Sequence, residues 1–397
     1  MRVSRAVALG TVGLCYAGAL VGLGGACGGS STSVPDAGAS GDMCNRTVPC
    51  ALPPSTPTSG MPTTQGHNYA VYDLYLGGTN ANPNAWETYG YNLDNLVTTS
   101  KSTDVCTLAK GASVTAQVDG NEGIDNSFGE NLWPILQTLV GMDSQDKINA
   151  TIQAGHFTIM TYVTGFDDTA MSTASATGLS GVLLAGGNYA DANGGTPPAW
   201  NTTTHWPIVP TLLTGCTPGG GCPAGTDPVA SATIKFGNAY QADGTFVSGS
   251  PANVSLQLSI GGVPLTIDIS SAVITFQPQG PGAVTNGIIA GTLVASDLVQ
   301  RLQLAVGAIE PGLCSGTASV AVAQYVMQAA DIVIDPTTGA VTNGPGVACN
   351  GISIGLGFDA KEIAAPTSAD IEDGSPPSPN PCATPTADAG TTEAGGD

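Results

Sequence analysis

The chain has 397 residues, and only 10% of them are charged, against about a quarter in an ordinary soluble domain. Nine basic residues face 30 acidic ones, and the resulting net charge of −21 argues against nucleic acid as a partner, because phosphate binding needs clustered Lys and Arg. The 55 glycines and 28 prolines indicate many turns, whereas an apolar fraction of 42% excludes a wholly disordered chain.

The N-terminus has the pattern of an export signal. Two arginines precede an uncharged, mostly apolar stretch, residues 6–23, and small residues then lead to Cys27. This pattern resembles the signal peptides of bacterial lipoproteins, in which the chain is cut before the cysteine and the cysteine receives a diacylglycerol. The resemblance implies a signal peptide over residues 1–26, a lipid on Cys27 and a place in the outer membrane, since Gly28 is not the Asp that retains such proteins at the inner membrane. Secretion without a lipid and an uncleaved anchor helix are the alternatives.

The cysteines of the exported part indicate disulfides. Ten cysteines occur in the chain, and setting aside Cys15 in the signal and Cys27 leaves eight. These eight are Cys44, Cys50, Cys106, Cys216, Cys222, Cys314, Cys349 and Cys382. An even number in an oxidising compartment predicts structural disulfides, and no Cys-x-x-Cys motif supports a metal site at these thiols. Spacing suggests the pairs Cys44–Cys50 and Cys216–Cys222 and leaves the others open.

Composition divides the exported chain into a tether, a packed body and a tail. Residues 27–66 lack apolar periodicity and are expected to form a flexible tether, and the acidic, Pro-rich residues 364–397 a disordered tail. Between them we expect a mixed α+β region over residues 67–190 and a Gly/Pro-rich linker or loop over 191–228. Residues 229–363 are expected to form an antiparallel sheet domain with one or two helices.

The clearest structural pattern is a β-hairpin around Gly261-Gly262. Apolar and polar residues alternate on both sides of these glycines, as in a hairpin with a primed two-residue turn. The predicted pairs are Ile260–Val263, Leu258–Leu265, Leu256–Ile267 and Val254–Ile269. In this register all eight apolar residues share one face, so the pattern and the turn support each other.

Other segments complete an α+β fold. Further strands are predicted at residues 69–76, 157–163, 232–236, 272–276, 287–294 and 352–358. Helices are predicted at residues 132–140, 145–154, 296–309 and 318–330, where apolar residues recur at helical spacing. The expected body is therefore antiparallel and sheet-rich, with a few packed helices.

The densest polar cluster of the sequence resembles the calcium loop of EF-hand proteins in part. Asp119, Asn121, Asp125 and Glu130 occupy the first, third, seventh and twelfth places of such a loop and would supply oxygen ligands. The sixth place holds Ile124 where the family has Gly. We therefore expect either a calcium loop of a looser type with these four ligands or a tight polar turn before the next helix.

An aromatic stretch is the candidate ligand-binding segment. Trp200, His205 and Trp206 lie close together in a chain that is only 5% aromatic. Exposed aromatic faces stack on sugar rings or on other apolar ligands. The alternative is that the two tryptophans pin a long loop onto the body.

Catalytic motifs are absent from the sequence. It contains no Gly-x-Ser-x-Gly, no His-Glu-x-x-His and no Walker loop, and its three histidines are widely separated. The adjacent carboxylates Asp167 and Asp168 could act as acid and base only if their environments separated their pKa values. No catalytic residue is therefore assigned.

These observations favour an exported, lipid-anchored envelope protein with a non-catalytic ligand-binding or structural role. Its expected partners are the membrane, through the lipid on Cys27, and an unknown extracellular ligand, with calcium as the one expected cofactor. One alternative is an extracellular hydrolase of a polymer that uses carboxylates, with Asp119, Asp125, Asp167 or Asp168 as candidates. Another is a carrier of an apolar ligand, with the hydrophobic face of the hairpin as part of its cavity.

Overall fold

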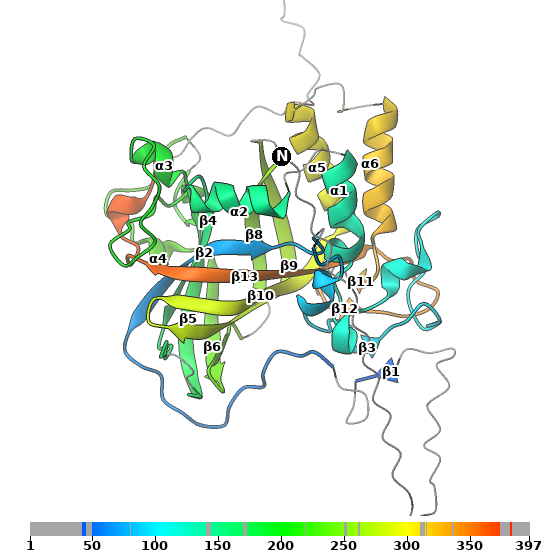
Figure 1. Ribbon diagram of the computed structural model, residues 1–397, viewed down its shortest axis with the longest axis horizontal. Helices are drawn as coiled ribbons and strands as arrows, with labels where there is room; N and C mark the ends of the chain where they lie inside the picture. The colour runs from blue at the N-terminus through cyan, green and yellow to red at the C-terminus, as the bar shows by residue number, and fades with distance from the viewer. Residues whose placement is uncertain are drawn as a thin grey trace, which may run out of the picture. The chain divides into compact units, whose positions relative to one another are not determined.

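Figure 1 shows a computed structural model of the chain. The structure describes residues 42–44, 50–79, 81–139, 144–169, 173–217, 219–249, 252–260, 263–309, 314, 316–335, 337–373 and 382. The predicted signal peptide and Cys27 lie outside the described residues, as does most of the predicted tail.

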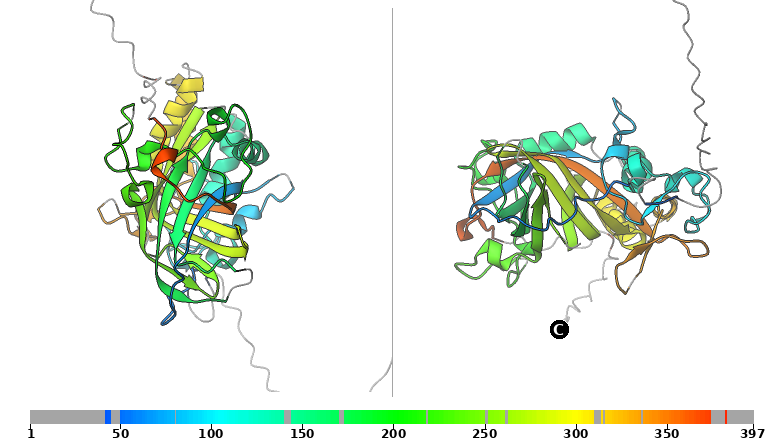
Figure 2. Two further views of the ribbon diagram at one scale, coloured as in Figure 1. Left: turned by 90° about the vertical axis from the view of Figure 1, so that its left-hand side faces the viewer. Right: turned by 90° about the horizontal axis from the view of Figure 1, so that it is seen from below.

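Eight antiparallel strands of the described chain form a closed ring (Figures 1 and 2). In order around the ring they are β2 (Gly66–Tyr75), β4 (Thr158–Thr164), β5 (Ala176–Gly186), β6 (Ile234–Ala242), β7 (Thr245–Val247), β9 (Val263–Gly280), β10 (Ala283–Val294) and β13 (Gly351–Ile363). β13 pairs with β2 and closes the ring, and β8 (Ala252–Ile260) pairs with β9 beside it. The antiparallel, sheet-rich body was predicted; its closure into a barrel, which leaves these strands no free edge, was not.

Strands from both predicted structural regions belong to this one sheet. β4, β5 and all of β2 but its first residue lie in residues 67–190, and the others lie in 229–363. β5 and β6 pair directly, with Leu183 opposite Ile234, although the Gly/Pro-rich segment separates them in the sequence.

The predicted hairpin register is confirmed by the pairing of β8 with β9. Residue by residue, Ile260 lies opposite Val263, Leu258 opposite Leu265, Leu256 opposite Ile267 and Val254 opposite Ile269. Five of these side chains are buried in one core cluster, namely Val254, Leu256, Leu265, Ile267 and Ile269. The two-glycine turn lies outside the described residues. Helix α5 (Ala295–Ile309) packs against β9 and contributes Leu298 and Leu302 to the same cluster.

Strand β9 is longer than the sequence indicated. Residues 263–269 and 272–276, predicted as separate strands, form one strand of 18 residues. The strand is interrupted at Ser271, whose φ of +52° is uncommon for a residue with a side chain. The first half of β9 pairs with β8, and the second half pairs with β7 and β10. The irregularity at Ser271 therefore lies between the part of β9 that pairs in the hairpin and the part that pairs in the ring.

The four predicted helices are present. They are α1 (Trp133–Leu139), preceded by a π-helical turn (Phe128–Leu132), α2 (Gln145–Gln153), α5 and α6 (Gly316–Gln328). The short elements are β1 (Asp42–Met43), β3 (Leu96–Val97), β11 (Val333–Ile334), β12 (Val341–Thr342), α3 (Tyr189–Ala192), α4 (Pro228–Ser231) and 3-10 turns at Ala85–Thr88, Val114–Gln117, Asn121–Gly123, Pro210–Leu212 and Ser368–Asp370. α2 is fixed to β2 because Asn149 Oδ1 accepts a 2.8 Å hydrogen bond from the Leu74 amide.

Aromatic side chains fill the barrel interior. Phe246 and Phe276 are stacked with ring centroids 4.5 Å apart, and Phe166 lies edge-on to Phe276 at 5.4 Å. Tyr69 and Phe358 contact the same Phe276 ring at 5.6 and 6.3 Å. All five are buried, so this part of the ring is a packed core.

The outer face of β2, β4 and β5 is buried as well. A second apolar cluster there joins Ala70, Met160 and Leu184 of these strands to Trp206 and Ile208 of the Gly/Pro-rich segment. Because both faces of these strands are covered, apolar and polar residues do not alternate strictly along them.

Four disulfides confirm the expectation from the cysteine count. They are Cys44–Cys50, Cys216–Cys222, Cys106–Cys349 and Cys314–Cys382. The first two are the pairs that spacing suggested. Disulfides persist in oxidising compartments, so they indicate an exported protein. Among the described residues, no helix combines the length and the hydropathy needed to cross a bilayer.

Candidate functional site

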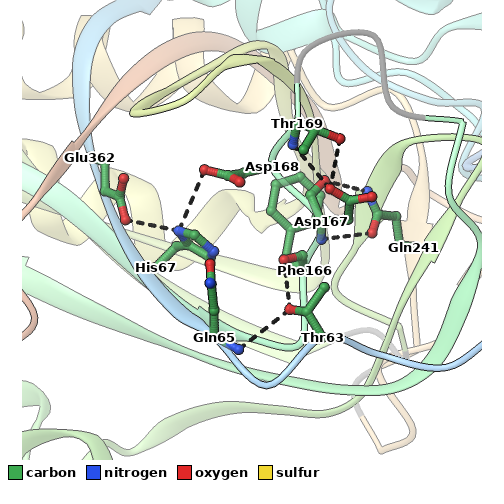
Figure 3. Close-up of polar contacts among 9 residues, drawn as sticks. All are labelled: Thr63, Gln65, His67, Phe166, Asp167, Asp168, Thr169, Gln241 and Glu362. Atoms are coloured by element: carbon green, nitrogen blue, oxygen red, sulfur yellow. Dashed lines mark hydrogen bonds and ion pairs between the residues drawn. The ribbon is translucent and has the colours of Figure 1, made fainter.

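Three polar side chains meet at the end of the barrel where β2 begins and β13 ends (Figure 3). His67 is the second residue of β2, and Glu362 lies near the end of β13, which pairs with β2 so that Glu362 is opposite Tyr69. Asp168 follows β4, which pairs with β2 on its other edge. The order β13–β2–β4 in the sheet therefore brings together residues that are far apart in the sequence.

The imidazole of His67 lies between the two carboxylates. Its Nδ1 is 2.8 Å from Glu362 Oε1 and 3.6 Å from Asp168 Oδ2. The side chains are 7% exposed for His67, 15% for Glu362 and 19% for Asp168. The other ring nitrogen, Nε2, is buried and has no hydrogen-bond partner among the described residues. We call His67, Asp168 and Glu362 the mouth cluster.

Tyr69 extends the mouth cluster toward the core. Its ring is stacked on that of His67 with centroids 5.9 Å apart, and its buried hydroxyl has no partner among the described residues. Burial raises the pKa of Tyr69 above its ordinary value, and the negative charges of Asp168 and Glu362 raise it further. The charges that act on the phenol of Tyr69 are therefore those of the same two carboxylates that contact the imidazole of His67.

The chain before β2 is bound to the segment that carries Asp168. Thr63 donates its amide to Gly165 O at 3.0 Å and its hydroxyl to Phe166 O at 3.0 Å, and the Gly165 amide donates to Gln65 O at 2.9 Å. This part of the predicted flexible tether is therefore attached to the barrel. Asp167, by contrast, accepts hydrogen bonds from Thr169 and takes no part in the mouth cluster (Figure 3).

Two buried and two half-buried aspartates gather at the opposite end of β13. Asp331 accepts hydrogen bonds from the amide and hydroxyl of Ser353, near the start of that strand. The other three accept backbone amides of one loop: Asp125 from Leu93, Asp119 from Thr98 and Asp94 from Leu96. We call these four residues the aspartate quartet.

The aspartates of the quartet act on one another. Burial raises the pKa of Asp119 to about 7, and the charge of Asp94 raises it as well. Burial also raises the pKa of Asp125 and of Asp331 well above the ordinary range, and the charges of other quartet members add to both shifts. Each carboxylate is costly to ionise in this environment unless a cation is present.

The structure brings two of the four predicted calcium ligands together. Asp119 and Asp125 both belong to the quartet, and the charge of Asp119 raises the pKa of Asp125. Asn121 is exposed on its 3-10 turn, and Glu130 lies on the π-helical turn, where its carboxylate accepts a hydrogen bond from Asn131. The quartet instead includes Asp94 and Asp331, which no local spacing connected with the predicted loop.

The aromatic stretch covers the outer face of the sheet. Trp206 is 2% exposed and donates its Nε1 to Gly187 O at 2.9 Å. Trp200 lies edge-on to Tyr72 at 4.9 Å, and His205 is exposed with Nδ1 3.2 Å from Asp370. These contacts support the alternative in which the tryptophans pin a loop onto the body.

A cavity of about 600 Å³ lies apart from both clusters. Its lining includes Thr79, Pro83, Pro134, Gln137 and Ser144, which belong to the segment after β2 and to the region of α1 and α2. Asp146 is the one ionisable side chain among the described residues that line this cavity.

Comparison of the chain with protein-family models, with curated proteins and with solved structures finds no match. The assignment of a function therefore depends on the geometry described above.

The aspartate quartet predicts a pH-dependent stability. Because the folded-state pKa values are raised, the folded protein binds more protons than the unfolded chain between about pH 4 and 7. In metal-free buffer the free energy of unfolding should therefore fall as the pH rises from 5 to 8. Asp125→Asn should flatten this dependence, whereas Asp243→Asn, an exposed control, should leave it unchanged. Denaturant unfolding at several pH values measures it, and parallel curves for wild type and Asp125→Asn would contradict the electrostatic account.

Proposed function

We propose that the chain is an exported protein held at the outer membrane by a lipid on Cys27. Its disulfide-bonded barrel has a non-catalytic role, as a structural or ligand-binding body of the cell envelope. Calcium at the aspartate quartet stabilises the end of the barrel that this quartet occupies.

The pairing of the cysteines carries the proposal. The eight cysteines that pair in the structure are the same eight that the lipoprotein pattern leaves after Cys15 and Cys27 are set aside. The disulfides support an oxidising compartment, and the small residues before Cys27 support cleavage and lipidation there.

Three of the four carboxylates considered for the hydrolase alternative make structural hydrogen bonds, and only Asp168 belongs to the mouth cluster. Asp119, which is half-buried, and Asp125, which is buried, accept hydrogen bonds from backbone amides of one loop. Asp167 accepts hydrogen bonds from its neighbour Thr169. Phenylalanine rings occupy the described barrel interior, which gives the apolar-carrier alternative no support there.

Calcium matches the chemistry of the quartet. Calcium takes oxygen ligands only, and the four carboxylates of the quartet would offer oxygen atoms to it. Burial, and then the charges of the other members, raise the pKa values of these carboxylates, and a divalent cation would offset the cost of ionising them.

The anchor predicts a defined mature N-terminus. When the full chain is expressed in a bacterium that processes lipoproteins, intact-mass and peptide mass spectrometry should find a chain that begins at Cys27 and carries a diacylglycerol. Cys27→Ser should be released from the membrane fraction without the lipid. An unmodified Cys27, or a mature chain that begins at another residue, would contradict the anchor.

Calcium should stabilise the protein at neutral pH. A ligand that binds only the folded state stabilises it by about 2.7 kcal/mol at 100 times its Kd. The thermal midpoint at pH 7.5 should therefore rise when millimolar calcium replaces a chelator, and Asp125→Asn should lose most of this rise. Asp243→Asn is the matched control. The calcium hypothesis fails if the wild-type midpoint is the same in calcium and in chelator.

A further inference from the structure

We propose that the mouth cluster, His67, Asp168 and Glu362, binds one divalent transition-metal ion of the zinc class. The three residues can each offer one ligand atom, and these atoms all lie within 4.8 Å of one another. This site is separate from the calcium proposed at the aspartate quartet, because the two clusters lie at opposite ends of β13.

The distances suit a tetrahedral ion. Zinc binds imidazole nitrogen and carboxylate oxygen at about 2.0–2.2 Å, which places tetrahedral ligand atoms roughly 3.4 Å apart. The Nδ1 of His67 is 2.8 Å from Glu362 Oε1 and 3.6 Å from Asp168 Oδ2. Small side-chain movements would therefore admit the ion without a change of the backbone.

Charge and burial favour a cation at this place. Two carboxylates that are 15% and 19% exposed face one imidazole, so a neutral His67 leaves a double negative charge in a poorly solvated environment. Buried charges persist when they are paired or when they coordinate a metal. A divalent ion would balance both carboxylates at once.

Two unsatisfied polar atoms beside the cluster point to a missing ligand. The Nε2 of His67 and the hydroxyl of Tyr69 are buried without partners among the described residues, and their rings are stacked. Metal-bound histidines usually donate their second N–H to a carboxylate, a carbonyl or a water. A water bound to the ion would complete four ligands.

The donor set selects the class of metal. Imidazole nitrogen suits zinc, iron, nickel and copper, whereas calcium takes oxygen ligands. Three protein ligands leave a fourth position for water. The ligands come from β2, from β13 and from the segment after β4. The ion would therefore connect the first and last strands of the ring to this segment, which also hydrogen-bonds to Thr63.

Zinc and cobalt titrations test the site. Protein stripped of metal with a chelator is titrated with zinc by calorimetry and with cobalt by visible absorption, which reports the geometry of the bound ion. We expect one ion per chain. His67→Gln, Asp168→Asn and Glu362→Gln should each weaken zinc binding by about 10-fold or more, as losses in metal sites commonly do.

Two control variants make the test specific. Asp167→Asn removes the same charge one residue away, and His156→Gln removes an exposed imidazole; both should bind zinc as the wild type does. Equal binding by the wild type and all five variants, or no zinc binding by the wild type, would overturn the proposal. If a cluster variant does not fold, the wild-type cobalt spectrum decides, since a six-coordinate spectrum would contradict the tetrahedral site. The calcium response should persist in Glu362→Gln, which separates this site from the quartet.

Discussion

The pairing of β2 with β13 is the constraint on which the rest of the structure depends. It joins the first and last strands of the ring and places Tyr69 opposite Glu362, although the polar contact between His67 and Glu362 spans 295 residues of sequence. Because β4 pairs with the other edge of β2, the same arrangement brings Asp168 to the mouth cluster. Without this pairing the sheet would be open, and the cluster would not exist.

The closed ring separates a packed middle from two polar ends. Phenylalanine rings fill the interior between them. At one end of β13 an imidazole joins two carboxylates, and at the other end four aspartates gather without an imidazole. The cations that we propose for the two ends differ accordingly, a transition metal at the mouth cluster and calcium at the quartet. In both cases the ion would connect segments that are distant in the sequence, as the disulfide Cys106–Cys349 does.

Local patterns predicted much of the fold but only part of the candidate sites. Alternation and a two-residue turn are short-range features, so the pairing of Val254 with Ile269 could be predicted in full. β5 was not predicted, because both its faces are covered and glycines interrupt it. Asp119 and Asp125 share one loop and were found together, whereas Asp331 and the contact of His67 with Glu362 depend on strand order, which no local spacing encodes.

Hydrogen exchange of the disulfide-intact protein, followed by mass spectrometry, tests the central pairing most directly. Amides of strands paired on both edges exchange only through large-scale opening, whereas amides of segments without such pairing exchange through small fluctuations. Residues 66–75 and 352–363 should therefore exchange slowly and together, and both should be slower than residues 51–62. Fast exchange of residues 66–75 beside protected residues 352–363 would show that β2 does not complete the ring and would contradict the account.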